Sequence, residues 1–139
     1  MQIGEFIIAR THAELLNQLL SRNYKGFGKS GLSLPDKKWL WMIRLGDFIS
    51  KSNWRNCLEN GSLLTEEHFG SFFDYQHTTA KLAQKNGVYV PAFEDRIVFD
   101  IIEYGKERKY IFRGVFTLDN ARCTLDKNVW IKYSDSYLF

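Results

Sequence analysis

The sequence has few residues of the types that build disulfide frameworks and metal sites. Its two cysteines, Cys57 and Cys123, lie 66 positions apart and outside any C-x-x-C motif. A disulfide framework or a zinc site is therefore not indicated, and two buried thiols are the simpler interpretation. The three histidines have no metal-ligand spacing. We expect no metal and no cofactor.

Proline and long apolar runs are also scarce. The longest apolar run, residues 39–43, is too short to cross a bilayer, and residues 1–10 lack the charged start and cleavage site of a signal peptide. The chain has 139 residues, two prolines and 45% hydrophobic residues, which is the composition of an ordinary folded protein. We expect a single domain over residues 1–139, located in the cytoplasm and without membrane contact.

Positive charge is abundant, but only in one part of the chain. Residues 1–60 hold nine Lys and Arg against five Asp and Glu, whereas residues 61–139 hold ten against eleven. Between residues 22 and 38, five cations surround a single acid, Asp36, and glycines lie between them. Such a segment suits a phosphodiester backbone, and a solvated loop is the plain alternative.

The run "KGFGKSG", residues 25–31, resembles the end of a phosphate-binding P-loop. A P-loop also needs a glycine five positions before its Gly-Lys pair, where this chain has Asn23, and a helix after the loop. Here the helix comes first, because Thr11 and Glu14 form a capping box before an apolar face at helical spacing. We predict a helix over residues 12–22 and exclude a Walker-type nucleotide site.

Strands are predicted after this loop. Residues 38–45 alternate in a way typical of a strand buried on both faces. Residues 96–104 and 109–118 form a predicted hairpin joined by "GKER", and residues 129–133 form a further strand. Tyr110, Phe112, Phe116 and Leu118 are expected to share one face with Gly114, which marks a bulge or a close approach.

Two more helices are predicted before the hairpin. Residues 50–61 have a serine at the start and Asn-Gly at the end, as a short helix does. A polar helix is expected within residues 65–86. The predicted fold class is α+β, with N-terminal helices packed on a mainly antiparallel, curved C-terminal sheet.

The candidate binding surface combines the basic loop with aromatic residues. The chain has 22 aromatic residues, several of them beside cations, and this pairing lets cations hold phosphate while rings stack on unpaired bases. Core packing is the alternative, and it is the expected position of Trp39 and Trp41. The predicted set comprises phosphate-neutralising cations (Arg22, Lys25, Lys29, Lys37, Lys38), glycines that let the backbone approach (Gly26, Gly28, Gly31), a hydroxyl donor (Ser30), stacking rings (Tyr24, Trp54) and base or phosphate contacts (Arg44, Arg55).

A catalytic alternative lies on the predicted hairpin. Asp100 followed by Glu107 and Lys109 has the acid, acid, lysine order of metal-dependent nucleases, in which two acids bind a metal and lysine orients water. Outward-facing charges beside a turn are the simpler interpretation.

At the C-terminal hairpin, "YIFRGVFTLD" followed by "VWIKYSD" resembles the PUA-like group of EVE, ASCH and SRA-type domains, and other modules associated with bacterial restriction nucleases. The resemblance implies a curved sheet flanked by helices, with a pocket for a modified or flipped base and no chemistry of its own. The helix and basic loop at the start depart from the usual opening strand of that group, so no pocket residue is transferred.

These observations predict a non-catalytic nucleic-acid-binding module, with DNA favoured over RNA, in a bacterial or phage restriction or defence context. Two alternatives remain open. One is a protein-interaction module such as an inhibitor or adaptor encoded by a mobile element, and the other is a small metal-dependent nuclease. A protein partner or a homodimer is compatible with the sequence.

Overall fold

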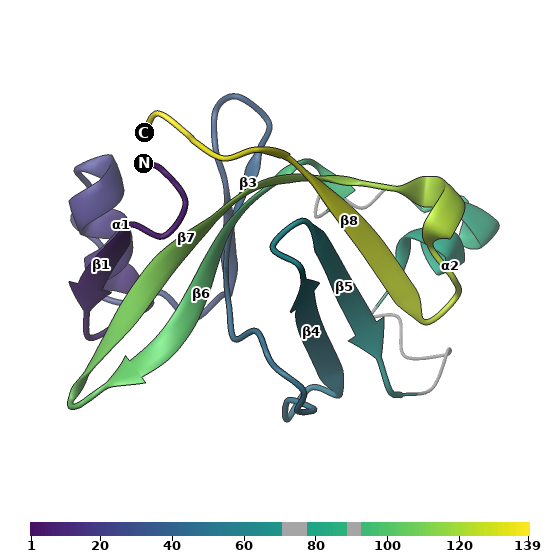
Figure 1. Ribbon diagram of the computed structural model, residues 1–139, viewed down its shortest axis with the longest axis horizontal. Coiled ribbons are helices and arrows are strands. Elements are labelled where there is room, and N and C mark those ends of the chain that lie inside the picture. Colours follow the sequence, from purple (N-terminus) through teal and green to yellow (C-terminus); the bar gives the residue numbers. More distant parts are fainter. Residues whose placement is uncertain (71–77, 89–92) are drawn as a thin grey trace.

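The computed structural model describes residues 1–70, 78–88 and 93–139, and its centre is one curved sheet (Figure 1). The sheet order is β2-β3-β6-β7-β8-β5-β4, and β1 pairs with β7 outside this path. All strand pairs are antiparallel except β3 with β6. The elements are β1 Phe6–Ala9, α1 His12–Leu20, β2 Gly31–Ser33, β3 Trp39–Ile43, β4 Trp54–Glu59, β5 Leu63–His68, α2 Ala80–Asn86, β6 Arg96–Tyr104, β7 Glu107–Leu118, the 3-10 helix η3 Asn120–Arg122 and β8 Lys127–Ser134.

Helix α1 confirms the first predicted helix and ends slightly earlier than expected. Thr11 caps it by accepting a hydrogen bond from the Glu14 amide at 3.2 Å. The Glu14 carboxylate accepts from the Arg10 amide, one residue before the position that the capping box predicts. The helix stops after Leu20 because Ser21 takes the left-handed conformation, with φ of 52°.

The predicted helix over residues 50–61 is wrong, since strand β4, Trp54–Glu59, occupies half of this range and the rest is loop and turn. Asn60 and Gly61 both have positive φ and, together with Ser62, form the three-residue turn between β4 and β5. Asn-Gly favours this type of hairpin turn as strongly as it favours a helix end. The Ser50 hydroxyl accepts from the Trp54 amide at 3.1 Å, but there it closes a loop before a strand.

The polar helix expected within residues 65–86 is correct only at its end. Helix α2 is capped by Thr79 and stops at Gly87, whose φ of 67° suits glycine. The beginning of that range, up to His68, belongs to β5. Residues 71–77 lie outside the described part of the chain. The fold is therefore α+β and richer in strands than predicted.

The long β6–β7 hairpin is confirmed and organises the sheet (Figure 1). Its turn is two residues long, Gly105 and Lys106, because the strands extend further than predicted. Strand β3 runs parallel to β6, and Leu40, Trp41, Met42 and Ile43 are all buried, as expected for a strand covered on both faces. Strand β8 then joins β7 to the β5–β4 hairpin.

A bulge at Gly114 divides the core into two clusters. The register shifts so that Val98 pairs with Gly114 but Phe99 pairs with Phe112, which leaves one extra residue in β7. Phe112 packs in the cluster beneath α1, whereas Phe116 packs with Trp41 and Trp130 on the other face. The expectation that Phe112 and Phe116 share a face is wrong, because the extra residue reverses the alternation.

Replacing Gly114 with alanine is expected to lower the free energy of unfolding by about 2–4 kcal/mol. Its φ is +115°, and an added Cβ would lie 2.8 Å from the Ser134 carbonyl oxygen. Urea denaturation measures the effect. Gly61→Asn is the matched control, because its φ is +71° with no atom near the added Cβ, and asparagine tolerates this conformation. Equal stabilities for both variants would contradict the packing argument.

The two termini lie together at one edge of the molecule (Figure 1). The Ile3 amide donates to the Asp135 carbonyl, and the Tyr137 amide donates to the Met1 carbonyl, both at 2.9 Å. In the described ranges, no helix has the length and apolar character needed to span a membrane.

Candidate functional site

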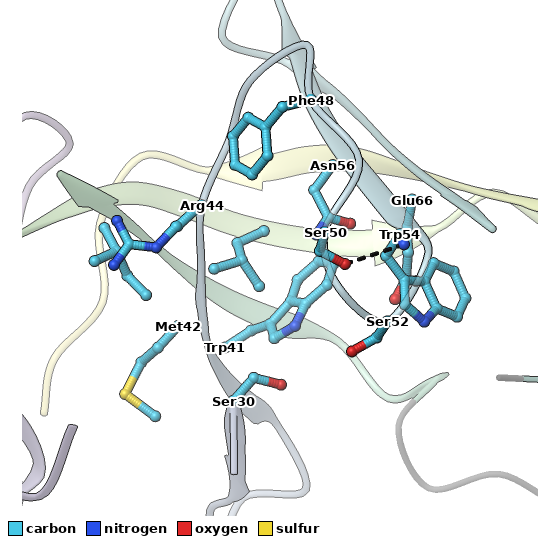
Figure 2. Close-up of a pocket in the computed structure, with 12 residues that line it drawn as sticks. Ser30, Trp41, Met42, Arg44, Phe48, Ser50, Ser52, Trp54, Asn56 and Glu66 are labelled. Atoms are coloured by element: carbon cyan, nitrogen blue, oxygen red, sulfur yellow. Dashed lines mark hydrogen bonds between the residues drawn. The ribbon is translucent and has the colours of Figure 1, made fainter. Parts of the chain in front are cut away.

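The best-formed pocket opens where β3 ends and the chain crosses to β4 (Figure 2). Its volume is about 310 Å³, which is within the range of small-molecule sites. Strands β3, β4, β5 and β6 and the connection between β3 and β4 all contribute to it. The lining residues are Ser30, Trp41, Met42, Ile43, Arg44, Phe48, Ser50, Ser52, Trp54, Asn56, Glu66 and Ile101.

Aromatic rings form much of the pocket wall. Trp41 comes from β3 and is only 4% exposed, while Trp54 comes from β4 and is half-buried against the ring of His68, with ring centroids 4.9 Å apart. Phe48, on the connection between β3 and β4, is 47% exposed. The pocket wall therefore includes aromatic surface on which a planar ligand can stack, most of it exposed at Phe48 and Trp54.

A row of polar side chains crosses the sheet beside these rings. Asn56 of β4 pairs with Glu66 of β5, which pairs with Asn128 of β8. The Asn128 amide donates to Glu66 Oε1 at 3.0 Å, and the Asn56 side-chain oxygen is buried without a hydrogen-bond partner among the described residues. Asn56 and Glu66 line the pocket and bring hydrogen-bond acceptors into it, beside the Arg44 guanidinium and the hydroxyls of Ser30, Ser50 and Ser52.

A buried cation supports this row. Arg96 Nη1 lies 3.4 Å from Glu66 Oε2, and the Arg96 side chain is 4% exposed. Burial lowers the pKa of the Arg96 guanidinium, and the charge of Glu66 opposes that effect. An arginine stays protonated in proteins, so a buried ion pair lies at the wall of the pocket, with Glu66 lining it and Arg96 behind.

The predicted basic loop reaches the pocket at one end only. Ser30 lines the pocket, and its carbonyl accepts from the Met42 amide at 2.7 Å. Lys29 precedes it and is exposed, as are Arg22, Lys25, Gly26 and Gly28. Gly31 is buried where an added Cβ would overlap the Trp39 ring, so packing explains this glycine.

Lys37 and Lys38 lie at the opposite end of the β2–β3 hairpin from Ser30. The hairpin turns between Leu34 and Lys38, whose backbone groups are joined by a 2.8 Å hydrogen bond. Lys38 Nζ also lies 3.4 Å from an Asp36 carboxylate oxygen. The five predicted cations therefore do not converge on one point.

The remaining predicted contacts have different positions. Tyr24 packs on the core beside Phe27 and is half-buried. Arg44 lines the pocket, and its guanidinium forms an ion pair with Glu103. Trp54 also lines the pocket, from β4.

Arg55 lies next to Trp54 in the chain but is occupied by acids. Its guanidinium nitrogens lie 2.6 Å from Glu67 and 3.1 Å from Asp47. The hydrogen bond to Glu67 raises the pKa of Arg55 above its usual value. A phosphate would compete with these carboxylates for the guanidinium.

The alternative catalytic residues are not brought together. The Asp100 carboxylate is buried, lies 3.3 Å from Arg113 and accepts from the Leu45 amide. Glu107 pairs across the hairpin with Tyr104, four positions further along β6 than Asp100. Lys109 Nζ lies 4.5 Å from the Tyr104 ring centroid. In the described residues, no group of three or more His, Cys, Asp and Glu side chains could hold a metal ion.

The sequence interpretation missed Glu66, Asn56 and Arg96. Glu66 and Asn56 meet across β4 and β5, a hairpin that was mistaken for helical segments. The Asn60-Gly61 pair was the available signal, because Asn-Gly is a strong indicator of a hairpin turn. Trp41 was expected in the core, and it both packs there and lines the pocket.

The fold and the pocket are those of a small module built on one curved sheet. Comparison with known proteins shows to which family this module belongs. The model of the SET and RING associated (SRA) domain matches residues 1–139, and the chain belongs to this family. The resemblance to the PUA-like group that includes SRA-type domains is thereby confirmed.

A solved structure supports the same fold. The structure titled "The 5-Hydroxymethylcytosine-Specific Restriction Enzyme AbaSI" is similar with a TM-score of 0.68 and 21% sequence identity over 97% of this chain. The match spans 41% of that enzyme's chain. No curated protein matches the chain.

Proposed function

We propose that this chain binds DNA and takes one base, turned out of the duplex, into the pocket of Figure 2, where it reads a modification of that base. In this proposal the chain binds without chemistry of its own and acts in a restriction or defence context. Membership of the SRA family supports it. So does similarity in fold to an enzyme whose title names 5-hydroxymethylcytosine and restriction.

The observation that carries the proposal is the combination of ring walls with a polar row that presents two acceptor groups, the Glu66 carboxylate and the Asn56 side-chain oxygen. Proteins that bind a flipped base stack it on aromatic or apolar side chains and read its Watson–Crick edge by hydrogen bonds. Trp41 and Trp54 supply the rings, and Glu66 and the unpaired Asn56 oxygen supply acceptors.

The acceptors indicate which bases fit. Cytosine carries an amino group that donates hydrogen bonds, whereas thymine presents an acceptor at the corresponding position. Glu66 and the Asn56 oxygen would therefore favour a cytosine-type base. Duplexes with one modified cytosine are the first substrates to test.

Binding to the DNA backbone is assigned to the basic loop. Lys29 and Ser30 adjoin the pocket and would contact the phosphates nearest the turned-out base, with Lys25 and Arg22 further along the same loop. Gly26 and Gly28 would let the backbone approach. Stacking by Tyr24 and phosphate contacts by Lys37, Lys38, Arg44 and Arg55 remain parts of the proposal.

Affinity for DNA is expected to fall steeply as salt rises, because phosphate contacts release counterions. Replacing Lys25 and Lys29 together with alanine should reduce the slope of log K against log salt by about one unit for each lost contact. Lys106→Ala, on the exposed turn between β6 and β7, is the matched control and should keep the wild-type slope. Binding that is unchanged between about 50 and 300 mM salt would reject the backbone contacts.

A further inference from the structure

Arg96 is a buried cation that lies behind the pocket and supports one of its walls. Its guanidinium carbon is 3.9 Å from the Trp41 ring centroid and 4.3 Å from the Trp130 ring centroid. The two rings are 6.3 Å apart and tilted by 53°. The guanidinium therefore fills the space between two indoles, and the pocket-lining ring of Trp41 rests on it.

The same guanidinium holds Glu66. Arg96 Nη1 lies 3.4 Å from Glu66 Oε2, while Oε1 accepts from Asn128 at 3.0 Å and from Trp130 Nε1 at 3.3 Å. Glu66 is 12% exposed, and its open side faces the pocket. The Arg96 guanidinium thus contacts two groups that line the pocket, the Trp41 ring and the Glu66 carboxylate.

Arg96 and the residues around Glu66 are also connected to neighbouring strands and to helix α2. Arg96 is the first residue of β6, paired with Trp39 of β3 and with Phe116 of β7. Asn128 accepts from the Ala80 amide at 2.7 Å, which links the carboxylate of Glu66 to the start of α2. The arrangement is therefore rigid before any ligand is present.

We propose that Arg96 is a positioning residue for base recognition, which holds the Trp41 ring and the Glu66 carboxylate in place before a base enters. This inference rests on the proposed function, because it takes the pocket to be the base site. Groups held in their binding geometry lose less conformational entropy when a ligand arrives. Lysine is a poor replacement, since an ammonium lacks the plane that lies between two rings.

The direct test is Arg96→Met, whose unbranched side chain fills the space without charge or plane. Wild type and variant are titrated, well below their Tm, with two duplexes that differ only in one 5-hydroxymethylcytosine for cytosine. We expect about tenfold or greater loss of affinity for the modified duplex and a change within about twofold for the unmodified one, since phosphate contacts dominate the latter. Arg96→Lys should recover only part of the preference. A variant with the wild-type preference overturns the inference.

Trp130→Phe keeps the test decisive if Arg96→Met fails to fold. Trp130 does not line the pocket, but it contacts Arg96 and donates to Glu66. Phenylalanine lacks this donor and covers less of the guanidinium. The preference for the modified duplex should fall here too, and an unchanged preference overturns the inference.

Near-ultraviolet circular dichroism separates this inference from the proposed function, because it needs no DNA. Arg96→Met should lose the signal that Trp41→Phe also loses, with the far-ultraviolet spectrum unchanged. If wild type prefers no modified duplex, the proposed function fails. A changed spectrum then still supports the positioning of Trp41, whereas an unchanged spectrum overturns it.

Discussion

Replacing Arg96 with alanine is expected to lower the free energy of unfolding by about 3–5 kcal/mol, because it leaves a buried carboxylate without its counter-charge. Glu66 would keep its hydrogen bonds from Asn128 and Trp130 but lose the guanidinium. The space between Trp41 and Trp130 would also be vacated. Since the free energy of unfolding of a domain is about 5–15 kcal/mol in total, this loss is a large fraction of it.

Two comparison variants identify the cause of this loss. Arg96→Met with Glu66→Gln removes both charges and keeps the volume, so most of the stability should return. Arg55→Ala removes an arginine that is about one-third exposed and also pairs with an acid of β5, Glu67, and it should cost far less. Urea denaturation of the four proteins measures the differences. A loss under about 1 kcal/mol for Arg96→Ala would contradict the account of a buried ion pair.

Replacing Trp54 with alanine is expected to weaken binding to the preferred modified duplex about 10- to 100-fold, since stacking contributes about 1–3 kcal/mol per base. Trp54 is half-buried at the pocket wall, and its ring is in contact with His68. The loss should fall on the modified duplex, because phosphate contacts do not depend on this ring. Fluorescence anisotropy with labelled duplexes measures both affinities.

Conservative and distant variants accompany this measurement. Trp54→Phe keeps an aromatic surface and should retain most of the affinity. Tyr104→Ala removes an exposed ring at the far end of β6 and should bind like wild type. If Trp54→Ala weakened binding to modified and unmodified duplexes equally, Trp54 would not be a base-stacking residue.

Some helices and strands could be predicted from the sequence, because their local sequence patterns favour the same structure that they adopt in the fold. Helix α1 has a cap, an acid in its first turn and an apolar face, and it forms as expected. The β6–β7 hairpin has long β-branched and aromatic runs on both sides of a glycine turn. Gly114 was expected to mark a bulge or a close approach, but its effect on the faces of β7 was not predicted, because the register depends on the partner strand.

The β4–β5 hairpin could not be assigned correctly from local signals. Serine at the start and Asn-Gly at the end are compatible with a helix and with a loop followed by a hairpin turn. Pairing with β8 decides between them, through contacts such as Glu66 with Asn128 that are far apart in the sequence. This error concealed the polar row of the pocket.

The candidate site was predicted from the distribution of charged residues along the sequence. The pocket, in contrast, is formed by residues of different strands that the sheet brings together. A count of lysines and glycines included Ser30, which lines the pocket, and its exposed neighbour Lys29. It also included Lys37 and Lys38, which the hairpin places at the other end. Arg96 could not be recognised, because the role proposed for it depends on Trp41 and Trp130, which meet only in the folded sheet.

The central claim is that the pocket reads a modified base, and a comparison of matched duplexes tests it most directly. Wild-type protein is titrated at about 150 mM salt with one duplex in four forms that carry cytosine, 5-methylcytosine, 5-hydroxymethylcytosine or thymine at the same position. The account predicts that one modified cytosine binds about tenfold or more tightly than cytosine and thymine, and that Trp54→Ala removes this difference. Equal affinities for all four duplexes would contradict it.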